Sequence, residues 1–149
     1  MNKSLLTQSL LKFTSGIVLV GLMLFLPAGS FAYWQGWLLM GILFVPMAIA
    51  GAVMLAESPE LLRKRLNAKE KENEQKAVVA LSGLLFIMSF TTAGLNWRYD
   101  CWVLPEWTVW TAAALFILSY ILYAEVLREN EYLSRIIEVQ EGQKVIDTG

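Results

Sequence analysis

The chain has 149 residues, of which 56% are hydrophobic and 17% are charged, and its 12 Lys and Arg nearly balance its 13 Asp and Glu. This balance excludes a basic nucleic-acid-binding protein, because no positive surplus is available to neutralise phosphates. The lack of His and the single Cys, Cys101, exclude His acid–base chemistry, His metal sites and an internal disulfide framework.

Long uncharged segments indicate the class of protein. No residue from Phe13 to Ala56 is charged, and one helix over this range would be about 66 Å long, about twice the hydrocarbon thickness of a bilayer. The range therefore predicts two spans separated by a turn at 27–30. The uncharged segments 77–97 and 107–124 each have the length of one further span. Because all of these segments are apolar all round, we predict an all-α, polytopic membrane protein with four transmembrane helices, at about 10–27, 34–56, 77–97 and 107–127.

The N-terminus also fits a second interpretation. Lys3 and Lys12 precede the apolar stretch 13–26, and Ser30-Phe31-Ala32 has the small-x-small pattern of a secretory cleavage site. A cleaved signal would leave three helices in place of four.

Within the spans, three features concern packing. Pro46 removes a backbone hydrogen bond and is expected to kink the second helix. Ala48 and Ala52 form a small-xxx-small pair that favours close approach of a neighbouring helix. For the hydroxyl groups of the third span we expect hydrogen bonds to other helices; these residues are Ser89, Thr91 and Thr92.

The loop 57–76 is rich in charge. Ser58-Pro59-Glu60 is typical of a helix start, so we expect a short cytosolic helix to about Arg65 or Leu66, followed by a solvated connector. The alternative is a patch for lipid headgroups at residues 63–65, which the five acids of the loop weaken.

Lys and Arg distribution predicts the orientation in the membrane. Eleven of these residues fall in the N-terminal arm, the loop 57–76 and the tail 128–149, whereas Arg98 alone falls in the opposite loop. By the positive-inside rule, both termini are expected to be cytoplasmic. The tryptophans support this orientation, because tryptophan prefers the membrane interface. All six fall at the opposite, outer ends of the spans: Trp34, Trp37, Trp97, Trp102, Trp107 and Trp110. Tyr120 and Tyr123 form a thinner belt at the inner end.

The tail is expected to begin as a cytosolic extension of the fourth helix. One helical face is mostly apolar, formed by Val126, Leu133, Ile136, Ile137 and Gln140. Glu131 and Arg135 form an i,i+4 pair, and Gly142 is expected to end the helix.

The residue types restrict the chemistry. No charge lies within the core of the spans, which argues against a proton-coupled transporter. Cys101 stands beside Asp100, and the sequence has no His that could activate its thiol as a nucleophile. The sequence offers no glycine-rich phosphate loop and no metal-ligand cluster.

Three stretches resemble one family. Residues 129–149 read ENEYLSRIIEVQEGQKVIDTG, and LPAGSFAYWQGW (26–37) and ESPELLRKRL (57–66) precede them. Together they resemble the N-terminal portion of the isoprenylcysteine carboxyl methyltransferase-like family of integral membrane methyltransferases, relatives of the phospholipid methyltransferases.

The resemblance implies transfer of a methyl group from S-adenosylmethionine to a lipid-soluble acceptor, in a cytosolic pocket beyond the fourth helix. It also implies a multi-pass protein, expected in a bacterial inner membrane, whose partners are the lipid bilayer and a lipid-like methyl acceptor. The entrance of the family's cofactor motif corresponds to four residues of this chain: Gln143, Val145, Ile146 and Gly149.

The family motif continues into an Arg-His-Pro stretch that this sequence does not contain. The hypothesis is therefore a membrane scaffold that is incomplete as it stands, with a further C-terminal portion or self-association supplying the rest. No catalytic residue is assigned. A non-enzymatic four-helix interaction protein is the alternative, and a small transporter a weaker one.

Overall fold

The structure is a computed structural model that describes residues 3–67 and 73–129, and every regular element in these ranges is a helix. Five helices follow one another along the chain: α1 (Lys3–Ala28), α2 (Trp34–Glu57), α3 (Pro59–Asn67), α4 (Asn73–Tyr99) and α5 (Glu106–Glu129). Helices α1, α2, α4 and α5 are long and apolar enough to cross a membrane. The predicted all-α, multi-pass class is confirmed.

The observed helices extend beyond the predicted spans. The first span was expected at about 10–27, but α1 begins at Lys3. The third was expected at 77–97, but α4 runs from Asn73 to Tyr99. Hydropathy marks only the apolar stretch of a helix, whereas backbone hydrogen bonding continues into polar turns beyond it.

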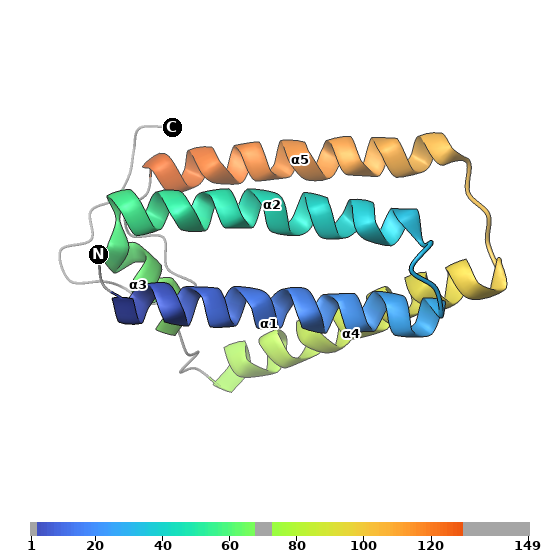
Figure 1. Cartoon of the computed structure of the whole chain (residues 1–149), viewed down its shortest axis with the longest axis horizontal. Helices are drawn as coiled ribbons and strands as arrows, with labels where there is room; N and C mark the ends of the chain where they lie inside the picture. The colour runs from blue at the N-terminus through green and yellow to red at the C-terminus, as the bar shows by residue number, and fades with distance from the viewer. Residues whose placement is uncertain (1–2, 68–72, 130–149) are drawn as a thin grey trace.

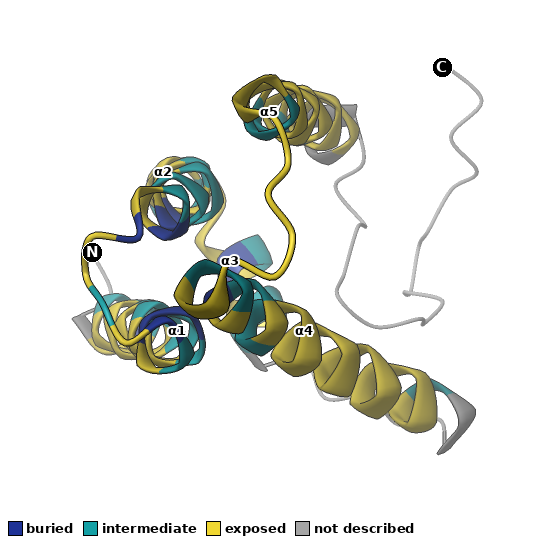
Figure 2. Ribbon diagram, turned by 90° about the vertical axis from the view of Figure 1, so that its right-hand side faces the viewer, coloured by how far each residue is buried: buried dark blue, intermediate teal, exposed yellow. Residues whose placement is uncertain are grey.

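The long helices lie roughly side by side and alternate in direction (Figure 1). Helix α1 packs most closely on α4, and α2 lies between α1 and α5. Figure 2, which looks along the helices, shows α4 and α5 diverging on one side of the molecule. The short α3 crosses one end of the bundle, against α2 and α1. We call this the basic end, after Lys12, Arg63, Lys64 and Arg65.

The six tryptophans gather at the opposite end, which we call the aromatic end. The turn from α1 to α2 lies there. Gly29 has a φ of +65°, a left-handed conformation that favours glycine, and its N–H donates to the Phe25 carbonyl at 2.9 Å. Glycine therefore closes the C-terminus of α1.

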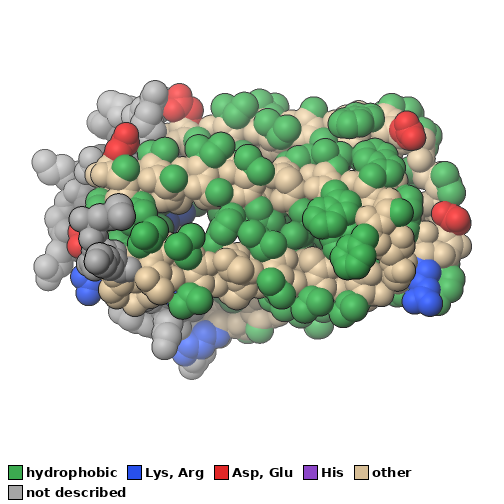
Figure 3. Space-filling model, viewed as in Figure 1, with side chains coloured by type: hydrophobic (Ala, Val, Ile, Leu, Met, Phe, Trp, Pro, Cys, Tyr) green, Lys and Arg blue, Asp and Glu red, His purple; other side chains and the backbone are tan. Residues whose placement is uncertain are grey.

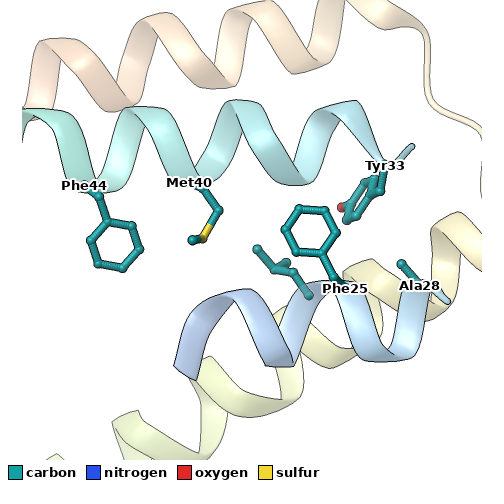
Figure 4. Close-up of a cluster of buried hydrophobic side chains, with 6 residues drawn as sticks. Phe25, Ala28, Tyr33, Met40 and Phe44 are labelled. Atoms are coloured by element: carbon teal, nitrogen blue, oxygen red, sulfur yellow. The ribbon is translucent and has the colours of Figure 1, made fainter. Parts of the chain in front are cut away.

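A small buried cluster holds α1 and α2 together (Figure 4). Leu24 is fully buried, and it is surrounded by Phe25, Ala28, Tyr33, Met40 and Phe44. Phe90, Ala93 and Trp97 of α4 pack against the same cluster. The core thus lies where α1, α2 and α4 meet.

Gly94 allows the close approach of α4 to α1. A Cβ atom at this position would collide with the carbonyl oxygen of Leu24 and lie 3.1 Å from the Ala28 nitrogen. The expectation that Ala48 and Ala52 provide a close helix contact is not met within the chain, because both are exposed. The small residue that lets two helices approach closely is instead Gly94, on α4.

Most of the apolar surface faces outward. Only 6–11% of the residues in the most apolar stretch of each spanning helix are buried within the chain. On the face seen in Figure 3, hydrophobic side chains cover the length of the bundle and charged side chains lie toward its two ends. This is the surface of a protein whose solvent is lipid.

Candidate functional site

Helix α3 ties the basic end together, and local sequence explains where it starts. The Ser58 N–H donates to Met54 as α2 ends, and the Ser58 carbonyl accepts from the Leu62 N–H at 3.2 Å as α3 begins. Pro59 occupies the first helical position and Glu60 the first turn, as predicted. Leu62 is 6% exposed, so the helix is anchored by its apolar face.

The other end of α3 is held by a cation from α1. The Lys12 ammonium donates to the Leu66 carbonyl, which lies in the last turn of α3, where carbonyl groups have no partner within the helix. A positive charge there also interacts favourably with the helix dipole. Lys12 therefore fixes the position of α3 relative to α1.

Arg65 links α3 to α5. Its guanidinium Nη1 donates to the Tyr123 hydroxyl at 2.7 Å, and its Cζ lies 5.7 Å from the centroid of the Tyr123 ring. The contact combines a hydrogen bond with a cation–π interaction. Through Lys12 and Arg65, α3 contacts both α1 and α5.

Tyr120 lies one helical turn before Tyr123 and contacts α2. Its hydroxyl donates to the Leu43 carbonyl at 3.0 Å, which anchors α5 to α2 at membrane depth. Because residues three, four and seven apart share a helix face, Phe116, Ser119, Tyr120 and Tyr123 form one stripe on α5. This stripe lines an open, shallow hollow of about 260 Å³, which we call the α5 hollow.

The aromatic end is closed by ring contacts. Tyr33 stacks on Trp97 with centroids 5.2 Å apart, and Trp34 stacks on Trp110 at 5.9 Å. These pairs join α4 to the α1–α2 turn and α5 to α2. Burial raises the pKa of the Tyr33 hydroxyl above its ordinary value of 10.0.

Asn96 shapes the loop that follows α4. Its side-chain Nδ2 donates to the Trp102 carbonyl at 3.0 Å, and its Oδ1 accepts from the Trp102 N–H at 2.8 Å. Asp100, the first residue after α4, has a φ of +47°. The loop presents an exposed thiol at Cys101 and a Trp102 side chain that is 80% exposed.

Ser89 does not fulfil the expectation of bonding between helices. Its hydroxyl donates to the Leu85 carbonyl of its own helix at 2.8 Å, and Ser119 bonds in the same way to Leu115. A hydroxyl that satisfies the carbonyl four residues earlier needs no partner from a second helix.

The described residues contain no set of groups suited to metal or acid–base catalysis. Within 3–67 and 73–129, no three His, Cys, Asp or Glu side chains are placed to hold a metal ion. Among the side chains that the structure describes, those of 4–66 and 75–126, no charged one is buried. What this part of the chain offers is the apolar α5 hollow, of which one lining residue, Tyr123, contacts the Arg65 guanidinium.

The residues predicted to contact a cofactor are Gln143, Val145, Ile146 and Gly149, and all four lie outside the described residues. The predicted helical extension beyond Glu129 and its stop at Gly142 also lie outside them.

Sequence patterns missed the roles of Tyr120, Tyr123 and Lys12. The two tyrosines were interpreted as a membrane-interface belt, and Lys12 was interpreted as part of a basic N-terminal arm. The spacing of the two tyrosines contains one usable signal. Positions 116, 119, 120 and 123 share one face of a helix, and this face carries hydroxyl groups. Nothing in the sequence indicates that this face meets Arg65.

Comparison with known proteins gives no relative: no family model matches the chain, and neither does any curated protein or solved structure.

Proposed function

We propose that this chain is the membrane scaffold of an S-adenosylmethionine-dependent methyltransferase that acts on a lipid-soluble acceptor, similar to the isoprenylcysteine carboxyl methyltransferase-like enzymes. One observation carries the proposal. The α5 hollow is open and apolar, and Tyr123, at one end of its lining stripe, lies about two helical turns before Glu129, the last described residue of α5. An acceptor dissolved in lipid would reach the protein there without crossing water.

The proposal places the basic end in the cytoplasm. Lys12, Arg63, Lys64 and Arg65 lie at this end, and the positive-inside rule assigns such clusters to the cytoplasmic side. The aromatic end, including Cys101, then faces the opposite side. A multi-pass protein in this orientation exposes its tail to soluble S-adenosylmethionine.

In this scheme the bound cofactor supplies an electrophilic methyl group, which the acceptor's nucleophile receives. We assign the described residues positioning of the acceptor only. Gln143, Val145, Ile146 and Gly149 are the residues we propose for contact with the cofactor.

Methyl transfer tests the proposal. Membranes containing the chain, and membranes containing it extended by whatever is encoded after Gly149, are incubated with radiolabelled S-adenosylmethionine, and label is then counted in extracted lipid. We expect incorporation above membranes without the protein in at least one of the two samples, with loss in Gln143→Ala. Label at background in both samples contradicts the proposal.

A second function is favoured by the exposure of the spans. Because only 6–11% of the most apolar stretch of each span is buried, much of each helix is open to contact with helices of another protein. In this alternative the chain is a non-enzymatic interaction protein. A defined complex in mild detergent, together with methyl transfer at background, would favour it over the enzyme.

A further inference from the structure

The loop between α4 and α5 has an apolar, outward-facing middle. Three successive side chains form this segment, and they are 80%, 81% and 69% exposed: Trp102, Val103 and Leu104. Charged residues stand outside it, Asp100 on one side and Glu106 on the other. Figure 2 shows the loop running between α4 and α5, exposed along its length. Water is a poor solvent for contiguous apolar surface of this kind.

We propose that the segment 102–104 inserts into the headgroup region of the leaflet at the aromatic end and anchors the α4–α5 loop to lipid. Its apolar side chains then lie at the boundary with the acyl chains, while Asp100 and Cys101 stay at the water side. The inference goes beyond methyl transfer and does not depend on it. The partner of this surface is the lipid interface itself.

The backbone at both ends of the segment suits this environment. The Asn96 amide donates to the Trp102 carbonyl at 3.0 Å and accepts from the Trp102 N–H at 2.8 Å. Pro105 has no N–H, and its carbonyl accepts from the Thr108 N–H at 3.0 Å and the Thr108 hydroxyl at 2.7 Å. Backbone groups that are bonded within the protein do not need water. Because irregular backbone exposed to lipid does not enter the hydrocarbon core, we assign the segment to the headgroup boundary.

The aromatic side chains favour lipid over a protein partner as the occupant. Tryptophan combines an apolar ring with an N–H donor, and this combination concentrates it at membrane interfaces. The rings of Tyr99 and Trp107, on either side of the segment, are exposed as well. Since α4 and α5 are the membrane-spanning helices that the loop joins, lipid already lies beside the segment.

An environment-sensitive nitrobenzoxadiazole dye, attached to a single thiol, tests the insertion. The double variant Cys101→Ser, Val103→Cys carries the dye at residue 103 of the full chain, in phosphatidylcholine nanodiscs that leave both faces open to the solution. Val103 is 81% exposed, so its replacement removes little packing. Two controls in the Cys101→Ser background carry the dye elsewhere: Arg63→Cys, exposed on α3, and Leu85→Cys, exposed within the α4 span.

Quenching from each side of the interface gives the depth of the dye. We expect aqueous iodide to quench the dye at residue 103 about threefold less than the dye at residue 63, as for a group about 5–10 Å into the headgroup boundary. A lipid with its nitroxide near the headgroup is expected to quench residue 103 more strongly than a lipid with its nitroxide near the chain ends. The dye at residue 85 is expected to show the opposite order.

Three results would overturn the proposal. Iodide quenching at residue 103 equal to that at residue 63 would place the segment in water. Weak quenching by iodide and by both nitroxide lipids would show that protein covers the segment, as in a contact between copies of the chain. Stronger quenching by the nitroxide near the chain ends would place the segment in the hydrocarbon core.

A charge at residue 104 tests whether the apolar side chains hold the segment in lipid. Leu104→Glu, added to the variant with the dye at residue 103, is expected to raise iodide quenching, because a carboxylate favours water. Leu104→Met, which keeps the side chain apolar, is the matched control and is expected to leave the quenching unchanged. Equal quenching in these two variants would contradict anchoring by the segment.

Discussion

Gly94 of α4 lies so close to Leu24 of α1 that a single added methyl group would meet the Leu24 carbonyl oxygen. Two of the three atoms that limit the approach, the Leu24 oxygen and the Ala28 nitrogen, belong to the α1 backbone, and the third is the Pro27 Cβ at 3.1 Å. Backbone cannot rotate away as a side chain can, so the α1–α4 interface depends on the absence of a side chain at this position.

Gly94→Ala is therefore expected to destabilise the fold by about 1–3 kcal/mol, the usual range for overpacking. Thermal unfolding in detergent, followed by circular dichroism, measures the change. Gly83→Ala is the matched control, because it lies on the same helix with nothing within 4 Å of an added Cβ. Alanine there is expected to be neutral or slightly stabilising. Equal melting temperatures for the two variants would contradict the close contact.

Tyr120→Phe removes the hydroxyl that donates to the Leu43 carbonyl. Hydrogen bonds between membrane helices are worth about 0.6 kcal/mol on average and up to about 1.7 kcal/mol, so we expect a loss within this range. Denaturant unfolding in mixed micelles gives the value. Tyr99→Phe, at an exposed ring on α4, serves as the control, and an equally large loss there would mean that the Tyr120 bond adds nothing.

Cys101 makes the orientation directly testable, since it is the only cysteine and its thiol is exposed at the aromatic end. A membrane-impermeant maleimide is expected to label it in intact cells. In the double variant Cys101→Ser, Ser58→Cys, the thiol moves to an exposed position at the basic end, and labelling is expected only after the membrane is permeabilised. The reverse pattern would place the basic end outside.

Tyr33 predicts a dependence of stability on alkaline pH. Burial raises the pKa of its hydroxyl in the folded state, so the neutral form is favoured by folding. This contribution is complete below the unfolded-state pKa near 10 and is lost as the pH rises through the higher folded-state value. We expect wild type to lose stability above about pH 10 more steeply than Tyr33→Phe. If wild type and Tyr33→Phe lose the same stability above about pH 10, titration of Tyr33 is not the cause.

Hydropathy and charge located all four spanning helices, and the helix-start pattern Ser58-Pro59-Glu60 located the short α3. The free energy of transferring a side chain into lipid depends mainly on that residue itself. Summing these free energies along the chain is therefore enough to find each span. The helix ends were less accurate, since α1 and α4 both extend into polar turns. The cofactor residues from Gln143 to Gly149 remain predictions.

The pairing of helices could not be obtained in the same way. Spans that are apolar on every side carry no polar stripe to show which face meets a neighbour, so Ala48 and Ala52 looked as suitable for close packing as Gly94. Arg65 and Tyr123 are 58 positions apart, and no local pattern connects them. The sequence by itself determined that the chain crosses a membrane and which ends carry positive charge. Only the tertiary structure decided which backbones touch and that Arg65 meets Tyr123, because these contacts depend on the rotation and tilt of whole helices.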